Sequence, residues 1–226
     1  MLFNTLLISA LASSALAFPF NQVAKRSGRA GNRRTTPAQA ALPDCSPDFV
    51  TCRCPADSFY QTSSSYIFWP VPAAEITRLT LNFHETAWFG TSPERVEGNA
   101  TAVGSKRFLR TELPDSFGTE LIVEELTELE LYEDGGYWMK FQMGDQPFWY
   151  QKKARGQWGL LAGSYDLIDV REVNGMAYML WDIHICFMDH FDLAAFHESG
   201  MNNLTAILKA EGTMPENATT IGPITF

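Results

Sequence analysis

The sequence has few basic residues for its length. Its 226 residues include 17 lysines and arginines against 26 aspartates and glutamates, which gives a formal net charge of −9. An acidic chain is repelled by phosphate backbones and by anionic lipid headgroups. We therefore expect neither nucleic acid nor a membrane among its partners.

Long apolar runs are also scarce. The one at the start, MLFNTLLISALASSALA, is too short to span a bilayer, and it ends with the small residues Ala15 and Ala17 in the pattern that signal peptidase accepts. No later segment approaches eighteen uninterrupted apolar residues. The sequence thus predicts a signal peptide over residues 1–17 and a secreted protein.

Acidic residues are missing from the next segment, residues 18–34. It carries five basic residues, four of them in the pairs Lys25-Arg26 and Arg33-Arg34. Such pairs in an exposed stretch after a signal peptide indicate a propeptide removed by a furin-type or Kex-type protease. A basic disordered arm that is retained is the alternative.

Only four cysteines are present: Cys45, Cys52, Cys54 and Cys186. In a secreted chain this number predicts two disulfides. A Cys52–Cys54 bridge would close a very tight ring, so we expect Cys186 to pair with Cys52 or Cys54 and Cys45 to take the other. Because oxidation is the ordinary fate of cysteine in this compartment, we predict no metal site and no cofactor.

Three N-x-T sequons also fit a secreted chain. They lie at Asn99, Asn203 and Asn217, and none has proline at the second position. We expect at least one of the three to be glycosylated.

The remaining chain reads as one domain with a strand-rich middle. After a cysteine-bearing tail over residues 35–57, we predict a strand over 58–68, a helix from Pro72, and a terminal helix over 191–210 ended by Gly212. Extended segments between the helices cover 93–96, 104–110, 119–132, 136–143, 161–172 and 176–187. Asn174-Gly175 is the strongest hairpin signal. We place the domain over 58–212 and a C-terminal tail over 213–226.

This order of elements resembles a known superfamily. The residues that carry the resemblance run from VPAAEITRLTLNFHETAWFG through TELIVEELTELELYEDGGYWMKFQM and AYMLWDIHICF to FDLAAFHESGMNNLTAIL. They are similar to START, pollen-allergen and polyketide-cyclase-like proteins, here in a secreted, fungal-type form. The resemblance implies an α+β helix-grip fold, with a curved antiparallel sheet of about six to seven strands wrapped around the C-terminal helix and an apolar cavity between them. It implies no particular reaction, because such folds host carriers, enzymes and binders.

Alternation along the strands predicts which side chains face that cavity. In the segment 176–187 the odd positions are all apolar, whereas Asp182, His184 and Cys186 occupy even positions and should lie on the outer face. The same reasoning turns Tyr137, Met139, Phe141 and Met143 inward. The side chains that we expect to contact a ligand are Trp88, Tyr137, Met139, Phe141, Tyr165, Trp181, Phe196 and Met201.

Three of the four histidines lie between Trp181 and Asn203. The outer-face position of His184 and the loop position of His190 favour structural roles. His197 lies on the apolar stripe of the terminal helix, where it could anchor a ligand or act as a general acid or base. The alternative is a buried histidine satisfied by a backbone carbonyl or by Tyr165.

Other polar and aromatic clusters have simpler readings. His84 and Glu85 follow the first helix near the expected cavity mouth, and Glu124, Glu128 and Glu130 are expected on one solvated face of their strand. The aromatic cluster Phe148, Trp149 and Tyr150 is either a lid over the cavity or ordinary core. The sequence has no nucleophile elbow, phosphate loop or H-E-x-x-H motif, so it assigns no reaction.

These observations predict a secreted glycoprotein that binds an apolar small molecule of polyketide, terpenoid or lipid type, with a cyclase-like tailoring role in secondary metabolism as a narrower form. The alternative is a secreted interaction protein or effector without catalysis. A cavity of several hundred Å³ with a few converging polar groups would favour the first, and an interior filled by side chains would favour the second.

Overall fold

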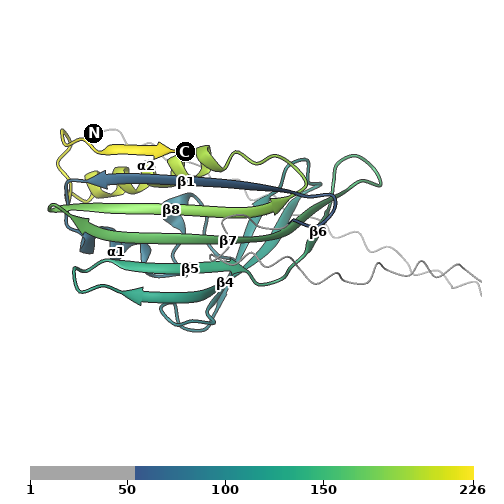
Figure 1. Cartoon of the computed structure of the whole chain (residues 1–226), viewed down its shortest axis with the longest axis horizontal. Helices are drawn as coiled ribbons and strands as arrows, with labels where there is room; N and C mark the ends of the chain where they lie inside the picture. The colour runs from purple at the N-terminus through teal and green to yellow at the C-terminus, as the bar shows by residue number, and fades with distance from the viewer. Residues whose placement is uncertain (1–53) are drawn as a thin grey trace, which may run out of the picture. The chain divides into compact units, whose positions relative to one another are not determined.

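The computed structural model describes residues 54–226, which form one antiparallel sheet with helices on one of its faces (Figure 1). The strands are β1 Phe59–Trp69, β2 Arg95–Glu97, β3 Lys106–Glu112, β4 Thr119–Leu131, β5 Tyr137–Met143, β6 Phe148–Gln151, β7 Trp158–Val173, β8 Met176–Phe187 and β9 Ile221–Thr225. The helices are α1 Ala73–Thr80, the short 3-10 helix η1 Ala87–Phe89 and α2 Leu193–Ala210. The strand order is β2-β3-β4-β5-β7-β8-β1-β9, and β6 pairs with β7.

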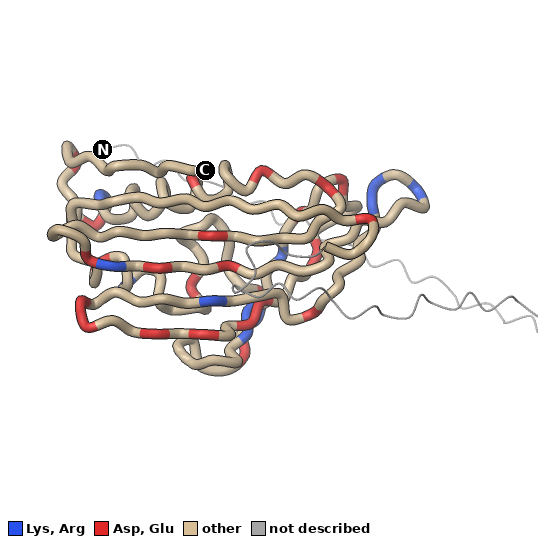
Figure 2. Tube along the Cα trace, viewed as in Figure 1, with Lys and Arg blue, Asp and Glu red and all other residues tan. Residues whose placement is uncertain are grey.

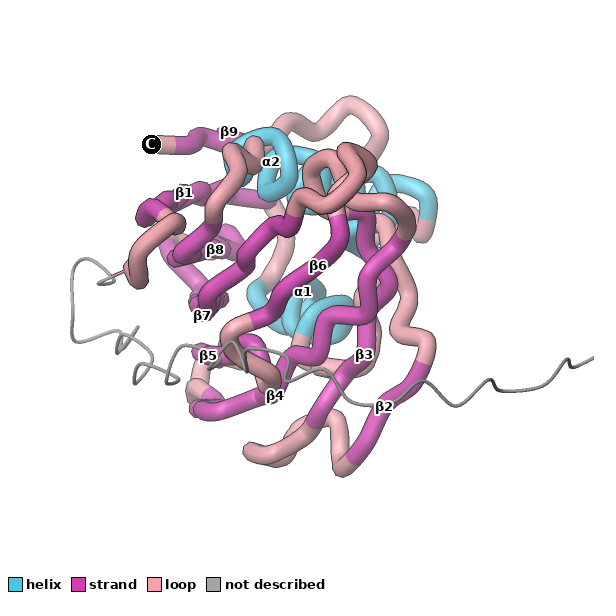
Figure 3. The backbone as a smooth tube through the Cα atoms, turned by 90° about the vertical axis from the view of Figure 1, so that its right-hand side faces the viewer, coloured by secondary structure: helices cyan, strands magenta, loops and turns pink. Residues whose placement is uncertain are grey.

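The predicted helix-grip architecture is confirmed, with strands that curve around α1 and α2 when seen end-on (Figure 3). The sheet has nine strands rather than six to seven, because β6 and β9 were not expected. The segment over 213–226, expected to be a tail, supplies β9, which pairs with β1 through Ser65↔Thr225 and Tyr66↔Ile224. Pro223 lies within the five residues of β9, so the sequence of this segment is not typical of a strand. Because β9 is at the edge of the sheet, it tolerates a proline.

Helix α2 begins and ends where the sequence indicates. The side chain of Asp192 caps it by accepting a hydrogen bond of 3.0 Å from the backbone N–H of Ala195. Gly212, with a φ of +74°, follows its last turn. Gly200 lets the helix approach the sheet, since a Cβ at this position would lie 3.1 Å from the ring of Trp181.

The hairpin between β7 and β8 also matches its sequence signal. Asn174 and Gly175 have φ angles of +54° and +76°, and the flanking residues Val173 and Met176 pair directly. Two consecutive left-handed residues form the turn whose twist suits antiparallel strands. This short connection sets the register between β7 and β8.

The inward faces of β5 and β8 are as predicted. The odd-numbered side chains of both strands are buried in the two clusters that fill the space under α2, which include Tyr137, Met139, Phe141, Met143, Ala177, Met179, Trp181, Ile183, Ile185 and Phe187. Asp182 and His184 lie on the other face. Alternation without interruption explains this success, because neither strand contains an irregularity in the β5–β7 or β1–β8 register.

A disulfide joins Cys54, just before β1, to Cys186 near the end of β8. Cys186 therefore pairs with one of its two expected partners. The bridge spans 132 residues of sequence, and the antiparallel pairing of β1 with β8 brings its ends together. Cys45 and Cys52 lie outside the described residues, as do the expected signal peptide and basic segment.

Charged side chains are spread unevenly along the described chain (Figure 2). Basic residues gather at the turn between β6 and β7, where Lys152, Lys153 and Arg155 follow one another closely, whereas acidic residues are distributed along the strands. Within residues 54–226, no helix combines the length and the apolar character needed to cross a membrane.

Candidate ligand-binding site

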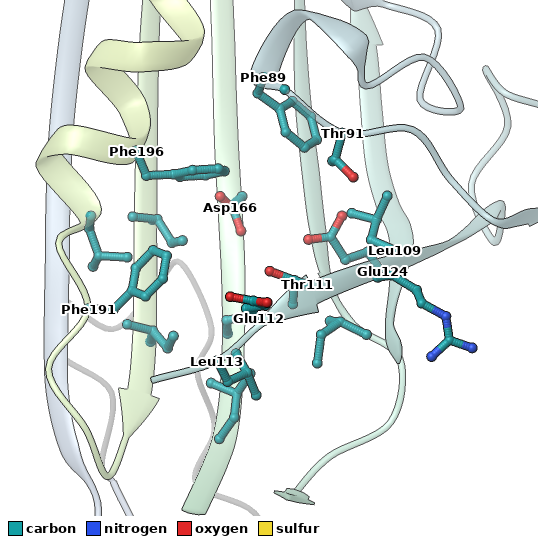
Figure 4. Close-up of a pocket in the computed structure, with 18 of the residues that line it drawn as sticks. Phe89, Thr91, Leu109, Thr111, Glu112, Leu113, Glu124, Asp166, Phe191 and Phe196 are labelled. Atoms are coloured by element: carbon teal, nitrogen blue, oxygen red, sulfur yellow. The ribbon is translucent and has the colours of Figure 1, made fainter. Parts of the chain in front are cut away.

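A cavity of about 440 Å³ lies between the start of α2, the loop after η1 and the inward face of the sheet. Most of its wall is apolar and comes from seven elements, with Phe89, Leu109, Ile122, Phe141, Leu161, Trp181, Ile183, Ile185, Phe187, Leu193 and Phe196 among the lining residues. The exposed residues Arg110, Glu112 and Thr119 also line it, so the cavity opens to solvent where β3 meets the start of β4. Figure 4 shows the rings of Phe191 and Phe196 turned into it from the helix side.

Arg107 and Glu124 form a buried ion pair in the cavity wall. They lie directly opposite each other on β3 and β4, and Nε of Arg107 donates to Oε2 of Glu124 at 2.5 Å. A second guanidinium nitrogen donates to the backbone carbonyl of Phe83 at 3.0 Å. The guanidinium carbon also lies 4.2 Å from the ring centre of Phe83 and 4.6 Å from that of Phe141. Arg107 therefore uses two of its N–H groups within the protein, on Glu124 and on the carbonyl of Phe83, and its guanidinium group contacts the rings of Phe83 and Phe141.

Asp166 places a second carboxyl group in the cavity. Its neighbours across β5 and β8 are Phe141 and Ile183, and Oδ1 accepts a hydrogen bond of 3.0 Å from Nε1 of Trp181. Burial raises the pKa of Asp166 well above its usual range, and the nearby Glu124 carboxylate raises it further. The hydrogen bond from Trp181 and the charge of Arg107 act in the opposite direction but are outweighed.

Two β-bulges bring these carboxyl groups inside. In β4 the register shifts between Leu126 and Glu128, so Glu124 faces the cavity whereas Glu128 does not. The expectation that Glu124 shares a solvated face with Glu128 and Glu130 is therefore wrong. In β7 the register shifts between Leu161 and Gly163. Leu161 and Asp166, at odd and even positions, consequently face the same way.

A profile of a START-domain family matches residues 60–222. The chain belongs to this family. Folds of this kind commonly bind hydrophobic ligands. No curated protein matches the sequence of the chain.

Solved structures with a related arrangement share little sequence with this START domain. Ara h 8.0201 is 13% identical, covers 67% of this chain over 99% of its own length, and has a TM-score of 0.47. A point mutant of norcoclaurine synthase from Thalictrum flavum, bound to a transition-state analogue, is 9% identical, covers 69% of this chain over 98% of its own, and has a TM-score of 0.45. The protein Mll3558 from Rhizobium loti is 12% identical, with coverages of 68% and 98% and a TM-score of 0.44. Identities this low carry no information about ligand or reaction.

Three of the eight residues expected to contact a ligand line the cavity of the START domain: Phe141, Trp181 and Phe196. Four others, Trp88, Tyr137, Met139 and Met201, belong to the tightly packed core beyond it. Tyr137 donates a hydrogen bond of 2.8 Å to Thr80, and Trp88 packs against Trp181 with ring centres 5.1 Å apart. The residue after Trp88, Phe89, is the one that reaches the cavity. These four residues do not line the cavity, because side chains fill that half of the space between the sheet and α2.

Tyr165 lies on the opposite face of the sheet and does not line the cavity. It stacks on His184 with ring centres 4.5 Å apart and clusters with Leu160, Ala162 and Cys186. An unbroken alternation from Leu161 would have turned it inward, and the bulge in β7 reverses that. His184 lies on the outer face as predicted.

His197 is buried and does not line the cavity. Its Nδ1 is hydrogen-bonded to the hydroxyl of Ser65 at 3.1 Å, and its ring stacks on Trp181 with centres 4.3 Å apart. Burial lowers the pKa of His197 to about 3. The histidine is therefore neutral at physiological pH. Among the described residues, Nδ1 has Ser65 as its partner, in place of the backbone carbonyl or Tyr165 that the structural alternative named, and Nε2 has no hydrogen-bond partner. This placement favours the structural alternative.

The polar residues of the cavity were missed from the sequence. Asp166 stands between Tyr165 and Leu167 in GSYDLID. A charged residue at the centre of a buried strand is the signal that could have singled it out. Arg107 follows Ser105 and Lys106 near the start of β3, so its sequence neighbours give no such signal. Among the described residues, no group of three histidine, cysteine, aspartate or glutamate side chains is placed to hold a metal ion.

The three sequons differ in their surroundings. Asn99 and Asn217 are exposed in loops. Asn203 lies within α2, and its side-chain amide donates to the carbonyls of Ala87 and Trp88 at 3.2 and 2.8 Å. The Asn203 side chain therefore ties α2 to η1.

Proposed function

We propose that this START domain belongs to a secreted glycoprotein that binds an apolar small molecule of polyketide, terpenoid or lipid type. The proposal rests on the cavity, which has a volume of about 440 Å³, a largely apolar wall and an opening to solvent. Side chains fill the rest of the space between the sheet and α2. Binding sites for small molecules are commonly apolar and contain a few placed polar groups. Arg107, Glu124 and Asp166 supply those groups here.

The secreted location rests on two features of the chain. Residues 1–17 have the pattern of a signal peptide, and the Cys54–Cys186 bridge is of the kind that persists in oxidising compartments. A cyclase-like role in secondary metabolism is the narrower form of the proposal. It would use the two cavity carboxyl groups, whose surroundings differ because Glu124 is paired with Arg107 and Asp166 is not.

Native mass spectrometry of the protein, secreted from a eukaryotic host, tests the binding function. We expect a co-purified small molecule that is released on denaturation. Ile183→Trp would fill the cavity and should abolish the bound mass, whereas Ile224→Trp, at a position 42% exposed on β9, should retain it. A ligand-free spectrum, together with equal binding of the apolar dye Nile red by both variants, would contradict the proposal.

A further inference from the structure

Asp166 is a carboxyl group in the cavity wall that forms no ion pair with another residue of 54–226. Asp166 is 5% exposed and lies between two apolar neighbours, Phe141 and Ile183. Within residues 54–226 its hydrogen-bond partner is Trp181, which donates to Oδ1. Figure 4 shows the carboxyl group of Asp166 in the space between Phe196 and Glu124. The second carboxyl oxygen of Asp166 is thus left for an occupant of the cavity.

Burial and the nearby carboxylates oppose ionisation of this group, and the charge of Arg107 offsets only part of their effect. On β3 and β4, Arg107 is committed to Glu124 and to the carbonyl of Phe83, and the Glu124 carboxylate remains beside Asp166. On β8, Asp182 adds a further negative charge from the outer face. On α2, His197 is uncharged. The Asp166 carboxyl group is buried and forms no ion pair within residues 54–226, so the protonated acid is the favoured form.

We propose that the cavity selects an uncharged ligand with an acceptor oxygen, such as a ketone, ester, lactone or quinone, and that Asp166 binds this oxygen as a neutral carboxylic acid. This inference rests on the proposed binding function. Trp181 occupies Oδ1, so the acidic proton on Oδ2 is donated to the ligand. An anionic ligand would be repelled by Glu124, and a cationic ligand would need Asp166 to lose its proton.

The ketone dye prodan, 6-propionyl-2-(dimethylamino)naphthalene, tests the inference against 6-propyl-2-(dimethylamino)naphthalene, which has the same rings without the carbonyl. Both dyes are titrated into the wild-type protein, Asp166→Asn and Asp166→Leu. Asparagine can accept from Trp181 and donate to the ligand, so it imitates the protonated acid, whereas leucine keeps similar volume and can do neither. We expect prodan to bind the wild-type protein and Asp166→Asn within about threefold of each other and Asp166→Leu about tenfold more weakly. The propyl dye should bind all three proteins alike.

The pH dependence of the unaltered protein provides a second readout that needs no variant to fold. Prodan affinity should fall as the pH rises and Asp166 loses its proton, and the same titration of Asp166→Asn should be flat.

The emission of bound prodan should be shifted to longer wavelength in the wild-type protein and Asp166→Asn, because the carbonyl is hydrogen-bonded, and not in Asp166→Leu.

The alternatives give distinct results. Loss of prodan binding in Asp166→Asn, or tighter binding of a trimethylammonium analogue by the wild-type protein, would show that an ionised Asp166 binds cations and would overturn the inference. Equal binding of both neutral dyes to all three proteins would also overturn it and leave the binding function intact. Failure of both dyes to bind the wild-type protein would overturn the binding function together with the inference.

Discussion

The imidazole of His197 stacks on the indole of Trp181, with ring centres 4.3 Å apart. Trp181 lines the cavity and His197 does not, so the histidine lies behind this wall and contacts the lining residues Trp181 and Phe196. Its other partner is the hydroxyl of Ser65 on β1, which in turn bonds Thr225 on β9 at 2.7 Å. His197 therefore connects α2 to three strands of the sheet.

Replacement of His197 by glutamine should lower stability without lowering ligand affinity. The variant loses the stacking contact and one of the two hydrogen-bond partners of the buried Ser65 hydroxyl, which is expected to cost about 1 to 3 kcal/mol in the free energy of unfolding. Urea denaturation and prodan titration measure the two quantities. His190→Gln, at an exposed loop position, serves as the control and should change neither. A selective loss of binding in His197→Gln would restore the catalytic or anchoring role.

Acidification should destabilise the protein through the same histidine. In the unfolded chain histidine takes up a proton near pH 6.5, whereas burial holds the pKa of His197 in the folded state at about 3. Between these values the unfolded state binds more protons, so the free energy of unfolding falls as the pH falls, by up to about 1.4 kcal/mol per pH unit. The difference in stability between the wild-type protein and His197→Gln should shrink as the pH is lowered from 6.5. A difference that stays constant down to pH 4 would contradict the assignment.

Removal of one partner of the buried ion pair should be costly. Arg107→Met leaves the Glu124 carboxylate and the Phe83 carbonyl without their donor, for an expected loss of about 3 to 5 kcal/mol. The double variant Arg107→Met/Glu124→Leu should recover much of that loss, because no lone charge remains. As a surface control, Arg110→Met breaks an ion pair with Glu94 in which both side chains are 51% exposed, and it should cost about 0 to 1 kcal/mol. Equal effects at the two positions, measured by urea denaturation, would show that the cavity pair is solvated.

The Cys54–Cys186 bridge should contribute measurably to stability. It closes a loop with a sequence separation of 132 residues, and loss of such a bridge from a secreted domain is expected to cost about 2 to 5 kcal/mol. Thermal unfolding of Cys54→Ser measures the loss. The matched control, Cys45→Ser/Cys52→Ser, keeps the bridge and should respond to reductant as the wild-type protein does. Peptide mapping without reduction that found Cys186 free would refute the pairing.

Glycosylation should follow the exposure of the sequons. When the protein passes through a eukaryotic secretory pathway, we expect glycans on Asn99 and Asn217, which are exposed. Asn203 should remain unmodified in the folded protein, because the nitrogen that would carry the sugar donates to two backbone carbonyls. Peptide mass spectrometry before and after enzymatic deglycosylation distinguishes the sites. A glycan on Asn203 of correctly folded protein would contradict the contacts between α2 and η1.

Local sequence signals predicted most elements of the fold. The cap at Asp192, the stop at Gly212 and the turn at Asn174-Gly175 each depend on residues next to one another in the chain, and the structure contains all three. The apolar odd positions of β8 likewise predicted which of its side chains face the core, because the strand alternates without interruption from Met176 to Phe187. Strand β9 was not predicted from the sequence, because its pairing with β1 joins residues 160 apart, as at Ser65 and Thr225. No local pattern indicates a partner that is so distant in the sequence.

The candidate site was decided by tertiary structure. The sequence by itself determined that Glu124 and Asp166 lie in extended segments, and an unbroken alternation along these segments would place Glu124 on one face with Glu128 and Glu130 and would turn Tyr165 inward. Each bulge adds one residue against the partner strand and reverses the facing of all that follows. Where such a residue is inserted depends on the pairing of two strands and on the space beneath α2, neither of which is local. The strands were therefore predictable, and the carboxyl groups that enter the cavity were not.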